Sequence, residues 1–288
     1  MTLTQALQHS ARIFSLNNME DSHIEARILL GHILMMSPAQ LYTEPERTLN
    51  QKQVNILQQL IERRLRREPA AYIVKHKEFY GTGFYVDSRV LIPRPETETL
   101  VEEALEFAIS RTNHSSSSTK PLLVADVGTG CGAIAISLAL NIPGIKIYAT
   151  DISPSALDVA RLNCEHHNVV EKITLLEGNL LEPVPEPVDL IAANLPYIKG
   201  PELACLSPEI CNYEPRVAID GGQDGLSQIR QLLKQAKGKI HPEGLLLLEI
   251  GQKQEKSVVS IINHYFPKAS HEFVTDLSGT KRMVKARL

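Results

Sequence analysis

The sequence predicts an α/β fold, in which a Rossmann-like, mostly parallel sheet is flanked by helices and preceded by a small N-terminal helical bundle. In residues 120–250, short apolar runs alternate with helical stretches, which is typical of a parallel sheet covered on both faces. In residues 1–70, apolar side chains recur at helical spacing only. A chain of 288 residues is long enough for both parts, so we expect two domains.

The first 70 residues are expected to form the helical bundle. Ser22 and Thr48 are the expected N-caps of two helices, because their hydroxyls can accept from free backbone amides. No catalytic group of residues is visible in this part, so a substrate-docking role and a purely structural role both stay open. Four arginines near its end are expected to form the solvated end of a helix and not a nucleic-acid surface. They are Arg63, Arg64, Arg66 and Arg67.

Residues 71–92 differ from the bundle, because their short runs with glycine and aromatic residues indicate a β-hairpin that links the two domains. Pro93 and Pro95 then precede a helix with acidic residues in its first turn, within the second domain, residues 93–288. The serine run at 115–118 predicts a flexible surface connection. Strands of the sheet are expected at 122–127, 145–150, 173–176, 190–193 and 244–250.

Composition and charge exclude several classes of protein. Apolar residues make up 43% and charged residues 22% of the chain, which is ordinary for a globular protein and unlike a disordered one. The net charge of -3 argues against a protein that mainly coats nucleic acid. No apolar window is long enough for a membrane span and the N-terminus lacks the layout of a secretory signal, so we expect a cytoplasmic protein.

The cysteines show no C-x-x-C pair, and no histidines stand near them at zinc-ligand spacing. We therefore expect neither disulfides nor a metal site, but reduced thiols that are mostly buried. The cysteines are Cys131, Cys164, Cys205 and Cys211.

A glycine-rich loop joins the first expected strand of the sheet to a helix. It contains Gly128, Gly130 and Gly132, and Asp126 stands at the end of the strand. Glycines let a ligand approach the backbone closely, and the helix N-terminus behind them favours electron-rich groups. The spacing is G-x-G-x-G and not the dinucleotide pattern G-x-G-x-x-G, which makes a pyrophosphate ligand less favoured although it stays open.

Two further expected strands also end in residues that suit ligand binding. Asp151 ends the next strand, where a carboxylate can accept hydrogen bonds from both hydroxyls of a ribose. After the third strand, Asn179 is placed to bond an adenine edge and Leu180 to pack on its face. Each feature alone also fits a tight turn or a helix cap, but a glycine loop, a ribose acid and an adenine contact in this order predict a pocket for S-adenosylmethionine.

The sequence Asn194-Leu195-Pro196-Tyr197 follows the fourth expected strand. Alone it reads as an ordinary strand-to-turn junction. At the ligand-binding edge of an α/β sheet, however, Asn194 offers an amide, Pro196 constrains the turn and Tyr197 provides an aromatic wall. These residues suit the grip of a planar amide or amine.

An amide nitrogen is a poor nucleophile because its lone pair is delocalised into the carbonyl. We expect Asn194 Oδ1 to accept one of its N–H groups and the backbone carbonyl of Leu195 or Pro196 to accept the other, with Tyr197 stacked beside the amide. The methyl donor is already activated, so no protein nucleophile and no metal is required, and orientation supplies much of the catalysis.

Several segments together resemble the HemK-type peptide chain release factor glutamine methyltransferases, the PrmC family. They are DVGTGCGAIAISLA, NLPYI, VLIPRPETETLVE, YEPRVAIDGGQDGL, PEGLLLLEIG and DLSGTKRMV. The resemblance covers nearly the whole chain, including the N-terminal helical domain. The resemblance implies an S-adenosylmethionine-dependent methyltransferase domain behind a helical domain, and methylation of the glutamine in the Gly-Gly-Gln motif of release factors. It implies no direct contact with nucleic acid or membrane, and we expect a monomer.

The resemblance also assigns residues to sites. The implied cofactor-binding residues are Asp126, Gly128, Thr129, Gly130, Cys131, Gly132, Asp151, Asn179, Leu180 and Asn194. The implied substrate-binding residues are Asn194, Leu195, Pro196 and Tyr197, of which Asn194, Pro196 and Tyr197 are the implied catalytic ones.

The chain departs from the family pattern at two positions. Leu195 stands where the family usually has proline, but it precedes Pro196 and so keeps a bias towards extended geometry. We expect the ring at this position to be dispensable. Lys75 stands where glycine is common, which puts the local hairpin geometry in doubt but not the chemistry.

Alternatives to this function stay open. An adenine-amine methyltransferase acting on DNA or RNA would use a similar tetrapeptide, but it needs a basic groove and stacking aromatics, whereas this chain has 5% aromatic residues and no tryptophan. A non-catalytic module that binds release factors is the other alternative. Gly221-Gly222-Gln223 repeats the substrate motif within the chain, and we expect it to be a loop and not a site of self-methylation.

Overall fold

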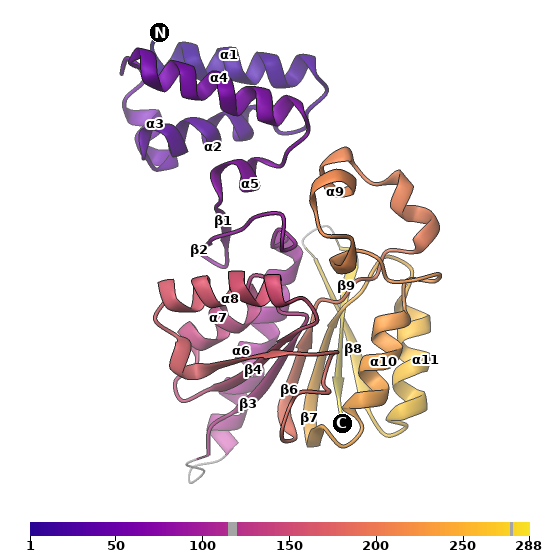
Figure 1. The fold of residues 1–288 in the computed structure, drawn as a ribbon. Helices are drawn as coiled ribbons and strands as arrows, with labels where there is room; N and C mark the ends of the chain where they lie inside the picture. The colour runs from indigo at the N-terminus through magenta and orange to yellow at the C-terminus, as the bar shows by residue number, and fades with distance from the viewer. Residues whose placement is uncertain (115–119, 277–278) are drawn as a thin grey trace. The chain divides into compact units, whose positions relative to one another are not determined.

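The larger part of the chain is built around a mixed sheet with the strand order β5-β4-β3-β6-β7-β9-β8 (Figure 1). Strands β3 to β7 pair in parallel in this order, and β9 runs antiparallel to both of its neighbours. The strands are β3 (Leu123–Val127), β4 (Lys146–Asp151), β5 (Ile173–Glu177), β6 (Val188–Ala193), β7 (Ile240–Glu249), β8 (Ser270–Thr275) and β9 (Lys281–Arg287). The predicted mostly parallel α/β fold is confirmed, while the final hairpin β8–β9 was not predicted.

The strand order reverses at the centre of the sheet. From β3 the chain moves to β4 and β5 on one side, and it then returns to β6 on the other side of β3. The carboxyl ends of β3 and β6 therefore form a topological switch point, the place where open α/β sheets bind ligands. Because Val127 pairs in register with Ala193, the glycine loop and the segment that begins at Asn194 leave the sheet side by side.

Helices cover both faces of this sheet (Figure 1). One face carries α6 (Glu98–His114), α7 (Ala133–Asn141) and α8 (Pro154–His166), and the other carries α10 (Ser227–Ala236) and α11 (Glu255–Tyr265). Every residue of β6 is buried, as expected of a central strand covered on both faces. Short 3-10 helices lie in the connections: η1 (Pro95–Thr97), η2 (Val170–Lys172), η3 (Gly200–Cys205) and η4 (Arg216–Ala218).

The computed structural model describes residues 1–114, 120–276 and 279–288, so the serine run at 115–118 lies outside the described residues. The chain divides into two units, Met1–His76 with Ser207–Tyr213, and Lys77–Leu206 with Glu214–Leu288. Within the described ranges, no helix has the length and apolar character needed to cross a membrane.

The smaller unit consists of helices around a core of its own. These are α1 (Leu3–Leu16), α2 (Ser22–Leu34), α3 (Pro38–Thr43), α4 (Gln51–Leu65), α5 (Ala70–Val74) and α9 (Pro208–Tyr213). Its core includes Phe14, Leu29, Leu30 and Leu57, all at most 1% exposed. The apolar pattern of the first 70 residues therefore gives the expected bundle.

The expected N-caps of this bundle were wrong. Asn50, and not Thr48, caps α4, because its side chain accepts from the amide of Gln53. Ser22 is the first residue of α2, and the cap position belongs to Asp21, which has no side-chain capping bond. Several polar residues that can cap a helix often stand close together near its start. Which of them becomes the N-cap depends on where the preceding backbone is held.

Of the four arginines near the end of the bundle, Arg66 is exposed as expected of a solvated helix end, Arg63 and Arg67 are partly buried, and Arg64 is buried, contrary to expectation. Arg64 is 4% exposed and pairs with Glu25 at 2.6 Å and Glu209 at 3.0 Å. Arg63 pairs with Glu68, and Arg67 pairs with Glu209. Both glutamates of Arg64 are distant in sequence, so the helix pattern alone gave no sign of them. These pairs occupy the guanidinium groups of three of the four arginines, which a nucleic-acid surface would need.

Residues 71–92, which were expected to form the linking hairpin, contain part of a helix as well as a hairpin. They begin with the end of α5, and the strands β1 (Lys77–Phe79) and β2 (Thr82–Phe84) form an antiparallel pair in their middle. Lys75 follows α5 with φ +56°, in the left-handed region that glycine adopts without strain. This explains the glycine of the family pattern, and the hairpin forms although lysine stands here.

The cysteines are less buried than expected. Cys131 and Cys164 are buried, but Cys205 and Cys211 are exposed. The exposed pair lies on η3 and α9, two short helices without buried residues. All four are free thiols.

Candidate active site

Asp126, the last but one residue of β3, organises the glycine loop from beneath. Its side chain is completely buried, and Oδ2 accepts hydrogen bonds from the Thr129 hydroxyl at 2.6 Å and the Ala135 amide at 3.1 Å. Burial raises the pKa of Asp126 to about 6. The other oxygen, Oδ1, is buried without a hydrogen-bond partner among the described residues. The Asp126 carboxylate thus fixes the loop through Oδ2, while Oδ1 remains able to accept a further hydrogen bond.

The loop itself is shaped by left-handed glycines. Gly128, Gly130 and Gly132 have φ angles of +76°, +56° and +85°. A Cβ atom at Gly130 would meet no heavy atom within 4 Å, so this part of the loop is open. Gly132 is the N-cap of α7 and provides no side-chain cap, which leaves first-turn amides for a ligand. Thr129 and Cys131, which alternate with the glycines in the loop, are buried, and burial raises the pKa of Cys131 to about 12.

Asp151 stands at the end of β4, next to the loop. Its Oδ2 accepts from the Gly130 amide at 2.9 Å and its Oδ1 accepts from the Ser153 amide at 2.9 Å. Burial raises the pKa of Asp151, while these backbone amides act in the opposite direction. Each oxygen keeps a second lone pair, so the carboxylate both braces the loop and remains able to accept from a ligand.

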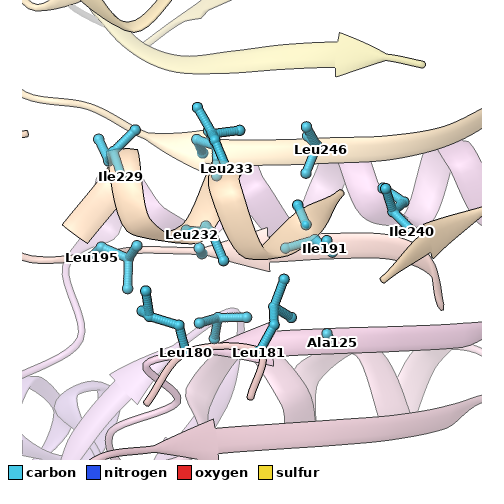
Figure 2. Close-up of a cluster of buried hydrophobic side chains, with 14 of the residues drawn as sticks. Ala125, Leu180, Leu181, Ile191, Leu195, Ile229, Leu232, Leu233, Ile240 and Leu246 are labelled. Atoms are coloured by element: carbon cyan, nitrogen blue, oxygen red, sulfur yellow. The ribbon is translucent and has the colours of Figure 1, made fainter. Parts of the chain in front are cut away.

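Asn179 and Leu180 follow β5, one strand further out. Asn179 Nδ2 donates to Glu182 Oε1 at 3.0 Å, which leaves its carbonyl oxygen as the free end of the amide. Leu180 is 8% exposed and has φ +55°, a strained conformation for leucine. Its side chain belongs to the same buried cluster as Leu195 and Ile229 (Figure 2), so little of it is left for contact with an adenine ring.

We call Asn194-Leu195-Pro196-Tyr197 the acceptor clamp. Asn194, Pro196 and Tyr197 are partly exposed, whereas Leu195 is 4% exposed and lies in the buried cluster shown in Figure 2. Leu195 also sits under the glycine loop, because its Cδ2 would be 3.2 Å from a Cβ atom on Gly128. No described group donates to the backbone carbonyls of Leu195 and Pro196.

Two residues that sequence reasoning did not assign to the site, Thr97 and Glu249, hold the side chains of the acceptor clamp. Asn194 Nδ2 donates to Thr97 Oγ1 at 3.0 Å, and Thr97 Oγ1 donates to Glu249 Oε2 at 2.6 Å. The hydroxyl of Tyr197 donates to Glu249 Oε1 at 3.3 Å. Burial raises the pKa of Glu249 to about 7 and also raises that of Tyr197. Thr97 and Glu249 both lie within sequence segments that resemble the family. This resemblance could have marked them as candidate site residues.

The backbone of the acceptor clamp is held by a second missed group. Gln254, 5% exposed, donates from Nε2 to the carbonyl oxygens of Tyr197 at 2.9 Å and Gly225 at 3.3 Å. The amide of Gly221 donates to Ile198 O at 2.9 Å. The Asp-Gly-Gly segment, residues 220–222, is therefore a brace for the clamp, and Gln223, which follows it, is exposed.

The structure thus brings the predicted residues to one edge of the sheet. The loop after β3, Asp151 after β4, Asn179 after β5 and the acceptor clamp after β6 follow neighbouring strands in the order β5-β4-β3-β6. In the described part of the chain, no group of three or more His, Cys, Asp or Glu side chains could hold a metal ion.

Comparison with known proteins gives the family. The family model described as PrmC N-terminal domain matches residues 5–74, and the one described as Methyltransferase small domain matches residues 113–207. The hMettl16 catalytic domain, solved in complex with the MAT2A 3'UTR hairpin 6, matches with a TM-score of 0.57 over 77% of this chain and 80% of that chain. Its 16% sequence identity supports the fold alone.

Two relatives extend over almost all of the chain. The release factor glutamine methyltransferase of Moorella thermoacetica is 38% identical over 98% of this chain and 97% of its own length. The release factor glutamine methyltransferase of Bradyrhizobium diazoefficiens is 35% identical over 93% of this chain and 89% of its own length. The chain therefore belongs to the release factor glutamine methyltransferase family of S-adenosylmethionine-dependent enzymes.

Proposed function

We propose that this protein transfers a methyl group from S-adenosylmethionine to the side-chain amide nitrogen of the glutamine in the Gly-Gly-Gln motif of peptide chain release factors. One observation carries the proposal: the hydrogen bond from Asn194 Nδ2 to Thr97 commits the donor end of the amide. Oδ1 is left to accept from an acceptor N–H, as the amide grip requires. The names of the two full-length relatives support the choice of acceptor.

The residues at the strand ends fit the cofactor. Asp126 Oδ1, buried without a partner in the described part of the chain, offers an acceptor for a cationic or N–H group that reaches the loop. Gly130 leaves open space where a side chain would stand, and Asp151 offers lone pairs for hydroxyl groups. We propose that these residues, with Gly128, Gly132 and Asn194, hold S-adenosylmethionine, with Asn179 reaching the adenine edge. Thr129, Cys131 and Leu180 are proposed to shape the pocket from behind.

The acceptor clamp is proposed to position the acceptor amide. Bound S-adenosylmethionine supplies an activated methyl group. Asn194 Oδ1 accepts one N–H of the acceptor amide and the carbonyl of Leu195 or Pro196 accepts the other, which holds the nitrogen lone pair in line with that group. Tyr197 stacks beside the planar amide. The proton of the acceptor leaves after transfer, so no strong base has to touch the nitrogen.

The organisation of the chain is also part of the proposal. We propose a helical domain of residues 1–70, a linker of residues 71–92 and a methyltransferase domain of residues 93–288. The match of the PrmC N-terminal domain to residues 5–74 supports the first of these. We further propose a monomer that acts in the cytoplasm and docks a protein acceptor without direct contact with nucleic acid.

Incubation with methyl-labelled S-adenosylmethionine tests the function. The protein is offered a folded release factor, the same factor with its motif glutamine changed to alanine, and a duplex DNA in separate reactions. We expect label on the intact factor only. Label on DNA and none on the factor would contradict the proposal and favour the adenine-amine reaction. Mass spectrometry of the enzyme itself should find no methyl group on Gln223.

Asn194→Ala tests the amide grip within this function. We expect kcat to fall by at least about a hundredfold, because an oriented acceptor of this kind is worth about 3 kcal/mol in the transition state. Binding of S-adenosylhomocysteine should change much less. Full turnover by Asn194→Ala would refute the proposed grip.

A further inference from the structure

A single carboxyl group reaches both functional side chains of the acceptor clamp. Glu249, the last residue of β7, is joined to Asn194 through Thr97 and to Tyr197 directly. Glu249 is 4% and Thr97 is 5% exposed. Because these groups are buried, water cannot replace a missing partner, and each hydrogen bond fixes the direction of the next one.

The number of hydrogens decides the direction of this chain of hydrogen bonds. The Thr97 hydroxyl has one hydrogen, and an ionised Glu249 has none to offer, so Thr97 donates to Glu249 Oε2. Thr97 can then only accept from the neighbouring amide, and only Nδ2 of Asn194 can donate. Oδ1 of Asn194 must therefore lie at the other end of the amide.

A protonated Glu249 permits the opposite direction. Its O–H can donate to Thr97, whose hydroxyl is then free to donate to Asn194 Oδ1. The amide of Asn194 would turn around and present Nδ2, a donor, to the N–H group of the acceptor. Two donors facing each other cannot form a hydrogen bond, so this direction is unproductive.

We propose that Glu249, acting through Thr97, is a positioning residue that sets the direction of the Asn194 side-chain amide so that Oδ1 meets the acceptor. The inference deepens the proposed function and rests on it. Tyr197, held by the other oxygen of the same carboxyl, keeps Glu249 from rotating away from Thr97. Neither Thr97 nor Glu249 touches the acceptor in this arrangement, and both act through Asn194.

Several groups set the charge of Glu249. Burial has the largest effect and raises its pKa to about 7, and the negative charge of Glu96 on η1 acts in the same direction. The hydrogen bonds from Thr97 and Tyr197 and the positive charge of Arg282 on β9 act against this. We therefore expect kcat to fall as the pH drops through about 7, because the fraction of ionised Glu249 falls there.

The test compares Thr97→Val, Thr97→Ser and Glu249→Gln in the full-length enzyme with a release factor as acceptor. Thr97→Val should lower kcat at least about tenfold with little change in the KM for S-adenosylmethionine, and Thr97→Ser should recover most of this loss. In Glu249→Gln, kcat should no longer fall as the pH drops through about 7. Ser137→Ala, which removes a buried hydroxyl on α7 that has no hydrogen-bond partner among the described residues, should behave like the wild type. Equal kcat values for Thr97→Val and Thr97→Ser would overturn the inference.

A readout without turnover separates this inference from the proposed function. The side-chain amide resonance of Asn194, identified by its loss in Asn194→Ala, should titrate with a midpoint near pH 7 in the wild type and not in Glu249→Gln. If the Asn194 amide resonance of the wild type does not change with pH, the positioning role of Glu249 is overturned, even if release factors are methylated. If methylation occurs on another acceptor instead, the release-factor assignment fails while the titration still decides the role of Glu249.

Discussion

A Cβ atom on Gly221 would lie 2.7 Å from the carbonyl oxygen of Pro196 and 2.8 Å from Cα of Tyr197. The brace and the acceptor clamp are therefore in direct backbone contact, at a carbonyl that we propose as an acceptor-binding group. This close approach gives the glycine of the Asp-Gly-Gly segment a physical reason, since any side chain would push the two backbones apart.

Gly221→Ala should lower kcat by at least about tenfold, because displacement of the Pro196 carbonyl misaligns the acceptor nitrogen. Steady-state kinetics with a release factor measure the effect. Gly200→Ala is the matched control, since a Cβ atom there would meet its nearest neighbour, Gly222 O, at an ordinary 3.8 Å. Comparable losses in both variants would show that the contact with the clamp is not the cause.

Leu195→Pro should separate activity from stability. Methylation should stay within roughly tenfold, about 1.4 kcal/mol in the barrier, because the position already precedes proline and its amide has no described hydrogen-bond partner. The free energy of unfolding should fall by about 1–3 kcal/mol, because the buried leucine side chain is replaced by a smaller ring. Assays alongside urea unfolding measure both, and near-total loss of activity in a folded variant would show that leucine itself is required.

Lys75→Gly should stabilise the smaller unit by up to about 1 kcal/mol, because glycine adopts the left-handed conformation at φ +56° without strain. Hydrogen exchange of the amides of α5 and α4 measures the change. Gln58→Gly, at an exposed position in the middle of α4, should have the opposite sign and a cost of about 1 kcal/mol. If Lys75→Gly were less stable than the wild type, the lysine side chain would contribute more stability than its left-handed backbone conformation costs.

Arg64→Ala should destabilise the smaller unit by about 3–5 kcal/mol, because it leaves Glu25 and Glu209 without their buried partner. Faster hydrogen exchange in α2 and α4 would report this loss. Arg161→Ala removes a pair with Asp158 in which both side chains are more than half exposed, and it should change stability by less than about 1 kcal/mol. Similar effects of the two changes would mean that burial of Arg64 has no energetic importance.

Glu249 is also expected to make stability depend on pH. Its pKa is raised in the folded state from 4.5 to about 7, so between these values the folded protein holds a proton that the unfolded chain has lost. The free energy of unfolding therefore falls as the pH rises through this range, by at most about 3 kcal/mol.

Glu249→Gln should remove this part of the pH dependence and leave the contribution of Asp126, whose pKa is raised to about 6. Urea unfolding of both proteins at pH 5 and pH 8 measures the difference. An identical slope with pH in wild type and variant would show that Glu249 is not the source. A gain in stability at pH 8 together with reduced turnover is the expected outcome, because the ionised carboxyl orients the site but destabilises the fold.

Much of the fold was predictable because its signals are local. An apolar run that ends in glycine or aspartate marks both a buried strand and its carboxyl end, as for Asp126 and Asp151. The strand ends β3 to β6 were therefore located to within two residues. The spatial order of these strands, which creates the switch point, came from the structure. The final strands β8 and β9 lack this signal, because several of their residues are exposed or half-buried and their apolar runs are short.

The sequence by itself determined the α/β fold, the family, and the order of the glycine loop, Asp151, Asn179 and the acceptor clamp along the strand ends. The roles of these residues at the site remain predictions. Only the tertiary structure decided what holds the clamp: Thr97 lies 97 residues from Asn194 and 152 from Glu249 along the chain. The same holds for Arg64, whose apparent place at a solvated helix end became a buried ion pair. Periodicity and turn chemistry act between near neighbours in sequence, whereas a buried hydrogen bond between distant residues forms only once the sheet has brought its elements together.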